Sequence, residues 1–305
     1  MQINKIEVSE LVEDSLPEYK KNSVNRMLKL LIKSKTGLIG LVIVLIVTII
    51  GIFAEQLAPF DPNAINPMLI NKPPAWLEGG EFAHFLGTDN LGRDLLSRII
   101  IGTKVSLIVG VCSIAIAGFI GMIIGLVSGF YGGFIDNFFM RLVDSFLAIP
   151  NILFMLVVLG VFGPGLLTLI LVIGATQWVT YARLVRGEVL SIKERDFVKA
   201  SRTLGTKDRT IVFKHILPNV ISSFIVVSTL SIATAILLEA SLSYLGLGIQ
   251  PPMISWGGIL EGGRNFLATA WWISTFPGIA ITITVLGIIF LGDWLRDVLD
   301  PRLTK

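Results

Sequence analysis

Long apolar runs constrain the fold of this chain more than any other feature of its sequence. Residues 37–54 read GLIGLVIVLIVTIIGIFA without one charged side chain, and comparable runs follow. About 20 apolar residues in a helix cross roughly 30 Å of hydrocarbon, and a helix satisfies its backbone hydrogen bonds within one segment. With 53% apolar and 15% charged residues, the 305-residue chain has little material for a soluble domain. We therefore expect an all-α integral membrane protein.

Six runs qualify as membrane-spanning helices. The third is the weakest of the six, because Pro150 interrupts it. The predicted helices cover residues 37–54, 105–128, 145–163, 165–182, 220–238 (extending to about 245) and 271–292.

The distribution of positive charge predicts the orientation of these spans. Twenty of the 25 Lys and Arg residues fall in the segments that six spans place on one side, and five fall on the other. Cytoplasmic segments carry the excess of Lys and Arg, so both termini are expected in the cytoplasm. This divides the chain into four parts, which are a cytoplasmic segment (1–36), the first span with an extracytoplasmic loop (37–104), a core of five spans (105–292) and a cytoplasmic tail (293–305).

The largest internal cytoplasmic loop, residues 183–219, holds nine Lys and Arg side chains. Each would cost roughly 2.5–3.5 kcal/mol at the bilayer centre, so the loop must lie in water. We predict that Asp196 caps a short helix whose one face carries Phe197, Ala200 and Leu204, and that Gly205 ends it. A second amphipathic stretch leads to Pro218 at the start of the fifth span. From the residues alone, this helical hairpin is either a solvated linker or a docking element for a soluble partner.

The loop resembles the EAA loop of ABC-importer permeases, which has the pattern E-A-A, three residues, Gly, nine residues, I-x-L-P. Here Lys199-Ala200-Ser201 stands at the E-A-A position, Gly205 follows three residues later, and His215-Ile216-Leu217-Pro218 follows after nine more. Lys, Ser and His replace Glu, the second Ala and Ile. The resemblance implies docking of an ATPase subunit by Asp196, Phe197, Lys199, Ala200, Ser201, Leu204, Gly205, His215, Leu217 and Pro218.

Other segments resemble the C-type permeases of dipeptide, oligopeptide and nickel importers. The motifs that carry this resemblance are GTDNLGRDLLSR (87–98), RLVDSFLAIP (141–150), EASLSYLGLGIQPP (239–252), SWGGIL (255–260) and GDWLRDVLDPRL (292–303). The run from KPPAW to AHFLGTD (72–89) is most similar to the dipeptide branch. The resemblance implies a MetI-like type I transmembrane domain in the bacterial inner membrane.

The resemblance also implies a set of partners. They are a homologous B-type permease forming a heterodimer, two cytoplasmic ATPases that use ATP and Mg²⁺, and an extracytoplasmic solute-binding protein. This chain is expected to bind no cofactor and no nucleic acid. It lacks the G-x-x-x-x-G-K-[ST] phosphate loop, and one cysteine with two histidines offers no catalytic or metal constellation. The expected function is therefore ATP-driven import of di- or oligopeptides by alternating access, powered by other subunits.

Nickel chelates and oligosaccharides are alternative cargoes, and a stand-alone secondary transporter is an alternative class. A secondary transporter would show inverted repeats and midplane charges, and neither is evident. A membrane enzyme would need a catalytic constellation that this chain does not supply.

Several polar and small side chains carry further expectations. Glu239 and Ser241 are candidates for the translocation path, although Glu239 is also expected near the outer interface, where water alone can solvate it.

Arg141 and Asp144 are expected to form a local ion pair. Thr88 or Asp89 is expected to cap a helix in which Asp94 pairs with Arg98. Small residues at four-residue intervals predict close helix packing within the chain, at positions 117, 121, 125 and 129.

Overall fold

A computed structural model of the chain describes residues 30–299. In this range the regular elements are all helical, and Thr88 and Asp94 form an isolated β-bridge. The expected all-α class is confirmed. The predicted cytoplasmic segment 1–36 and the tail 293–305 lie partly outside the described residues.

Five helices are long and apolar enough to cross a membrane by themselves, as the hydrophobic runs predict. The fourth of them is part of a longer helical stretch, Asp208–Leu247, which is interrupted near its end by a kink at Gly246 (φ 84°). The five are α3 (Lys35–Ile52), α5 (Leu95–Tyr131), α8 (Leu166–Lys193), α11 (Leu217–Leu242) and α13 (Trp272–Leu299).

The expected third span, residues 145–163, is not one straight helix. The chain forms α6 (Gly133–Leu147) and α7 (Asn151–Phe162), which meet at an angle of 83°. Pro150 stands immediately before α7, where its missing N–H interrupts no helical hydrogen bond. Residues expected to form a cytoplasmic loop before this span are instead helical. The two helices count as a sixth span only if the bent pair is taken as one.

The core of the bundle is the packing of α5 against α8, and glycine makes it possible. A Cβ atom added to Gly121 would lie 2.3 Å from the Cβ of Tyr181, and one added to Gly125 would lie 2.6 Å from the Cβ of Val185. The small-residue face therefore lets the two helices approach closely within the chain, as the sequence predicts.

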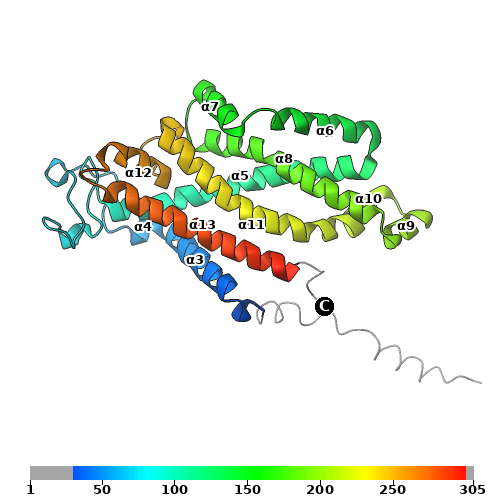
Figure 1. Cartoon of the computed structure of the whole chain (residues 1–305), viewed down its shortest axis with the longest axis horizontal. Coiled ribbons are helices and arrows are strands. Elements are labelled where there is room, and N and C mark those ends of the chain that lie inside the picture. Colours follow the sequence, from blue (N-terminus) through cyan, green and yellow to red (C-terminus); the bar gives the residue numbers. More distant parts are fainter. Residues whose placement is uncertain (1–29, 300–305) are drawn as a thin grey trace, which may run out of the picture.

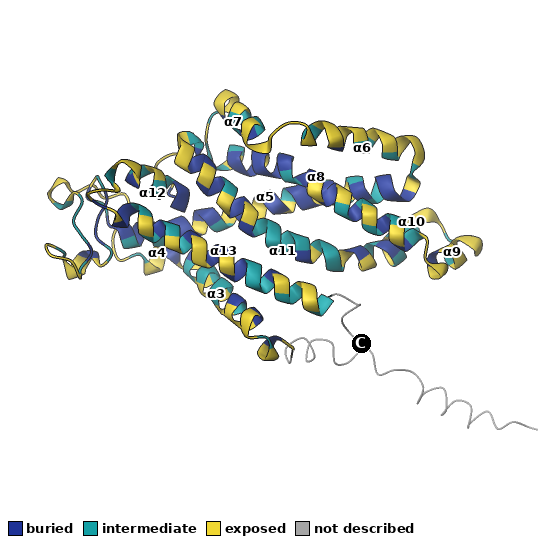
Figure 2. Cartoon of the chain, in the orientation of Figure 1, coloured by how far each residue is buried: buried dark blue, intermediate teal, exposed yellow. Residues whose placement is uncertain are grey.

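Helix α3 lies at the edge of the bundle (Figure 1). It packs mainly on α13, where Gly40 and Gly287 allow the two backbones to come together. Half of its residues are exposed and most of the others are half-buried, as expected for a peripheral helix that faces lipid (Figure 2).

Apart from α6 and α7, which lie along α8, the elements between the spans gather at two opposite ends of the long axis (Figure 1). One end holds a helical hairpin made by α9 (Asp196–Thr203), α10 (Asp208–Thr210) and η3 (Ile211–Ile216). The other end holds the proline-rich loop with α4 (Ala54–Leu57), η1 (Pro67–Leu69), η2 (Phe82–His84), η4 (Ser243–Leu247), α12 (Trp256–Gly263) and η5 (Arg264–Phe266).

Candidate functional site

The turn of the helical hairpin forms at Gly205, as the sequence predicts. Its φ of 78° lies in the left-handed region, which glycine adopts without a Cβ penalty. The N–H groups of Gly205 and Thr206 donate to the carbonyls of Arg202 and Ser201, and these bonds close the end of α9. The predicted cap at the other end is wrong. Asp196 is the first helical residue, Arg195 holds the capping position, and no side chain caps the helix.

A small apolar cluster fixes the hairpin to the bundle. Val198 of α9 is buried against residues that include Ile211 and Ile216 of η3 and Val189 of α8. The guanidinium of Arg202 lies 5.5 Å from the centroid of the Phe130 ring, close enough for a cation–π contact. Because these anchors come from both sides of the turn and from two spans, the hairpin is an extension of the bundle.

Opposite these anchors, the hairpin leaves large apolar side chains in solvent. Phe197, Leu204 and Phe213 are 42%, 86% and 56% exposed. Asp196, Lys199 and Ala200 are also exposed, and Lys199 pairs with Glu194 at 3.1 Å. Exposed apolar side chains on a charged segment are typical of a protein interaction surface. Phe213 belongs to the second amphipathic stretch expected from the sequence but is not among the ten residues predicted to dock the ATPase.

The second half of the predicted site lies beside the first. Ser201 Oγ is 3.5 Å from Nε2 of His215, and the His215 ring is 6.2 Å from that of Phe197. Leu217 and Pro218 form the first turn of α11, with the proline where its missing N–H is harmless. The structure therefore brings all ten residues of the predicted docking site onto one hairpin and the helix that follows it.

Two ion pairs connect α6 to α8, and one corrects an expectation. Asp144 pairs with Arg183 at 2.6 Å, and not with Arg141 as its sequence spacing suggested. Asp136 receives two hydrogen bonds from Arg186, at 2.5 and 2.6 Å, and a further one from Ser128. A helix that is mostly exposed is thus fixed to the core by charge-assisted bonds (Figure 2).

The two candidate path residues face different surroundings. Ser241 lines an open groove of about 410 Å³ between α11, η4, α12 and α13, together with Leu237, Ala240, Tyr244, Leu245, Leu260, Gly278 and Ile281. Glu239 is fully buried, so the expectation that water solvates it at the outer interface is wrong. Its carboxylate accepts hydrogen bonds from Ser243 at 2.7 Å and from Ser106 at 3.3 Å.

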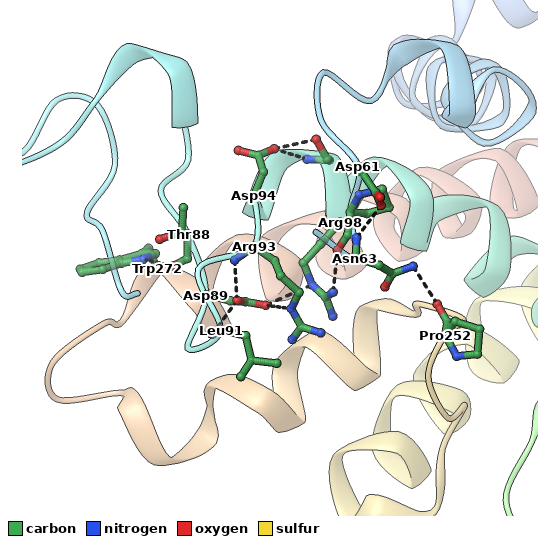
Figure 3. Close-up of polar contacts among 12 residues, drawn as sticks. Asp61, Asn63, Thr88, Asp89, Leu91, Arg93, Asp94, Arg98, Pro252 and Trp272 are labelled. Carbon is green, nitrogen blue, oxygen red and sulfur yellow. Dashed lines mark hydrogen bonds and ion pairs between the residues drawn. The ribbon is translucent and has the colours of Figure 1, made fainter. Parts of the chain in front are cut away.

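The loop at the far end from the hairpin is held by a buried polar network (Figure 3). Asp89 accepts hydrogen bonds from the backbone N–H groups of Leu91 and Arg93, and its carboxylate pairs with Arg93 Nε at 2.7 Å. Arg98 Nε lies 3.3 Å from the same carboxylate, and the guanidinium also donates to the Pro62 carbonyl at 2.9 Å. This network ties two stretches of the proline-rich loop, at Pro62 and at residues 89–93, to the start of α5.

The N-terminus of α5 differs from the expected one. The helix starts at Leu95, ahead of the predicted start at residue 105, and its cap is Asp94 in place of Thr88 or Asp89. Asp94 accepts from the backbone N–H of Ser97 at 2.7 Å and contacts Nδ1 of His84 at 2.9 Å, so the expected pairing with Arg98 does not form. Thr88 instead joins the loop to α13, because the Trp272 indole donates to its carbonyl at 3.0 Å (Figure 3).

At the surface of this loop, Lys72 and Glu81 form an exposed ion pair. Lys72 Nζ donates to Glu81 Oε1 at 2.8 Å. That hydrogen bond, with the positive charge of the lysine, lowers the pKa of the Glu81 carboxyl below its usual value. At neutral pH this ion pair therefore joins two positions of the proline-rich loop, residues 72 and 81.

Two family models match the chain. One, described as "Binding-protein-dependent transport system inner membrane component", matches residues 121–305. The other, described as "N-terminal TM domain of oligopeptide transport permease C", matches residues 25–74. The first covers the hairpin, the groove and Glu239, and the second covers α3 and part of the proline-rich loop.

Curated proteins similar to the chain are transport permeases. The dipeptide transport system permease protein DppC of Escherichia coli is 44% identical over 273 residues, which are 90% of this chain and 91% of that protein. The di/tripeptide transport system permease protein DppC of Pseudomonas aeruginosa is 41% identical over 270 residues, covering 88% and 89%. The oligopeptide transport system permease protein OppC of Bacillus subtilis is 40% identical over 272 residues, covering 89% and 87%.

Proposed function

The chain belongs to the family of binding-protein-dependent transport system inner membrane components, and from this premise we propose that it is one permease subunit of an ATP-driven importer of di- and oligopeptides. Relatives named for dipeptide, di/tripeptide and oligopeptide transport match about nine-tenths of its length, which favours peptides over nickel chelates or oligosaccharides.

The helical hairpin is the proposed docking site for a cytoplasmic ATPase. Its apolar side chains at positions 197, 204 and 213 are exposed, although the segment lies outside any apolar span. A soluble ATPase that covers them would remove this surface from water, a favourable contribution to binding. ATP and Mg²⁺ are then used by that partner, and this chain binds neither. The hairpin end accordingly faces the cytoplasm, in agreement with the nine Lys and Arg residues of the segment 183–219.

The observation that carries the mechanism is the continuity of the helix after the turn. Residues 208–245, up to the kink at Gly246, form one helical stretch that begins in the hairpin and ends at the groove lined by Ser241 and Tyr244. A movement imposed on the hairpin is therefore transmitted along a stiff element to the other end of the molecule. Alternating access then arises as a rigid-body change driven by ATPase closure.

The remaining partners are assigned to the other surfaces. A homologous permease is proposed to face the groove, so that the two chains enclose the path between them. A solute-binding protein is proposed to deliver the peptide to the proline-rich loop. That loop is held in one shape by the Asp89 network, which gives a binding partner a fixed surface.

The test is reconstitution of the chain with its cognate permease, ATPases and binding protein in liposomes. We expect uptake of a labelled dipeptide that requires ATP, Mg²⁺ and the binding protein, and that unlabelled peptides inhibit while nickel and oligosaccharides do not. Uptake by the chain alone would identify a secondary transporter and overturn the proposal. ATP-dependent uptake that only nickel or an oligosaccharide inhibits would correct the cargo.

A further inference from the structure

We propose that Glu239 is a positioning residue that fastens the short helix α12 to α5 and α11, and so holds the walls of the groove in place. The inference deepens the proposed function and rests on it, because the groove is taken as part of the peptide path. The observation on which it rests is the buried carboxylate of Glu239, for which the binding of the expected partners gives no reason.

The environment of Glu239 is polar but lacks a positive charge. Its side chain is fully buried, and within the described residues it forms no ion pair with Lys, Arg or His. Two serine hydroxyls donate to the carboxylate, from Ser243 one turn later and from Ser106 on α5. Burying a carboxyl group is costly unless its hydrogen bonds are made, so the geometry of these serines is strongly constrained.

The constraint extends to α12 through Ser106. While its hydroxyl donates to Glu239, its oxygen accepts the backbone N–H of Trp256 at 3.3 Å. Trp256 is the first residue of α12, and its indole donates to the Ile99 carbonyl of α5 at 3.0 Å. A chain of hydrogen bonds therefore runs from α11 through α5 to the start of α12. Residue Ser255 caps α12 by accepting from the N–H of Gly258.

Close packing leaves these elements little freedom to shift independently. A Cβ atom on Gly257 of α12 would lie 2.6 Å from the Cβ of Ser243 and 2.7 Å from the Cα of Ala240. A Cβ atom on Gly102 of α5 would lie 3.1 Å from the Trp256 ring. Glu239, Ser106 and the start of α12 thus form one closely packed unit, which we call the Glu239 latch.

The latch lies directly behind the groove. Leu237, Ser241 and Tyr244 line the groove from α11 and η4, and Leu260 lines it from α12. Glu239 and Ser243 alternate with these residues along the same helical turns but point into the protein interior. Release of α12 from α5 would change the separation of two groove walls without altering any residue that lines them. The latch therefore controls groove shape indirectly.

Replacement of Glu239 by leucine separates this role from a role in stability alone. Leucine is apolar and of similar size, and the freed serines can bond to carbonyls of their own helices, so the melting temperature in nanodiscs should stay near the wild-type value. Peptide uptake per assembled complex should fall by about tenfold, corresponding to ~1.4 kcal/mol, while ATP hydrolysis continues at the wild-type rate. Glu239→Gln offers both an acceptor and a donor and should retain most of the uptake.

Two further variants complete the test. Ser106→Ala removes the bridge to Trp256 and should reproduce the uncoupling of Glu239→Leu. Thr234→Val is the matched control, because Thr234 is exposed on the same helix and bonds only to its own Leu230 carbonyl. Hydrogen exchange of the α12 amides should accelerate in Glu239→Leu while exchange in α5 and α8 is unchanged. This measurement reports on the latch whatever the cargo is.

The outcomes distinguish failure of the latch from failure of the proposed function. If the wild-type complex shows no ATP-driven peptide uptake, the proposed function is wrong, and α12 exchange alone decides whether the latch exists. If wild-type uptake is present but Glu239→Leu keeps it and exchange at α12 is unaltered, the latch proposal is overturned. It is equally overturned if Glu239→Leu only lowers melting temperature and abundance, with uptake per complex unchanged.

Discussion

Gly205 sets the shape of the hairpin through its backbone and not through packing. No atom lies within 4 Å of a Cβ built on it, but its φ of 78° costs other L-residues about 1–2 kcal/mol. Gly205→Val should therefore distort the turn, displace Leu204 and Phe213 from their positions, and reduce both ATPase co-purification and peptide uptake by roughly tenfold. Membrane abundance of the chain should not change.

The matched control for this prediction is Gly205→Asn. Asparagine tolerates the left-handed region far better than valine, so this variant should bind the ATPase and transport nearly as well as the wild type. Normal ATPase binding by Gly205→Val would show that the turn geometry is unimportant. Equal losses in the valine and asparagine variants would place the defect in contacts made by the glycine surface itself.

The two candidate path residues illustrate how far sequence reasoning extends at this scale. The position of a residue along a spanning helix gives its depth in the membrane, and this depth alone suggested that water reaches the Glu239 side chain. Burial depends on the face, and the face is set by α5 and α12, of which the α5 contact, Ser106, lies 133 residues away in the sequence. One local signal was available, since Ser243 follows Glu239 at the i,i+4 spacing that brings helical side chains together.

At the scale of elements, hydropathy predicts the five straight spans well because each needs only a sufficient length of apolar residues. It fails at α6 and α7, because a sum over residues 145–163 cannot detect that the chain bends by 83° at Pro150. The helical hairpin could be predicted because its signals are local, namely a glycine, a proline and a charged segment. The cap of α5 could not be predicted, because it depends on which carboxylate of the loop lies within hydrogen-bonding distance of Ser97 and His84.

The contact between α5 and α8 leads to a prediction about assembly of the bundle. Gly121→Leu would place side-chain atoms where Tyr181 and the Trp178 carbonyl already lie, so the helices must separate. We expect loss of folded protein in the membrane, measured by abundance and by fluorescence-detected size exclusion. The matched control is Gly187→Ala on α8, where the added methyl group meets no atom within 4 Å. That variant should be stable, and helix propensity favours it by about 0.5–1 kcal/mol.

The ion pair of Asp136 and Arg186 leads to a second prediction at this scale. Asp136→Ala removes two charge-assisted hydrogen bonds that fix α6 to α8, at a cost of about 1–2 kcal/mol because the pair is partly exposed. Hydrogen exchange in α6 should increase while exchange in the α5–α8 core stays the same. The double exchange Asp136→Arg with Arg186→Asp should recover part of the protection. Unchanged exchange in Asp136→Ala would indicate that apolar contacts alone hold α6.

At the scale of the whole molecule, the two surfaces proposed for partners lie at opposite ends of the bundle (Figure 1). The proposed function requires these ends to be on opposite sides of the membrane. Cysteine labelling in intact cells tests this requirement directly. The chain has one cysteine, Cys112, and Cys112→Ser provides a background without thiols. Met68 in the proline-rich loop and Leu204 in the hairpin are 88% and 86% exposed, so cysteines placed there are equally accessible to a reagent that reaches their side.

A membrane-impermeant maleimide should label Met68→Cys in intact cells and should label Leu204→Cys only after the membrane is permeabilised. The charge bias that supports this orientation comes from twenty cationic side chains against five, so a single substitution should not invert it. In permeabilised cells, co-expression of the ATPases should protect Leu204→Cys but leave Met68→Cys reactive. Labelling of Leu204→Cys in intact cells would invert the topology and remove the hairpin from the reach of ATP. Labelling only after permeabilisation, without protection by the ATPases, would retain the topology but reject this hairpin face as their docking site.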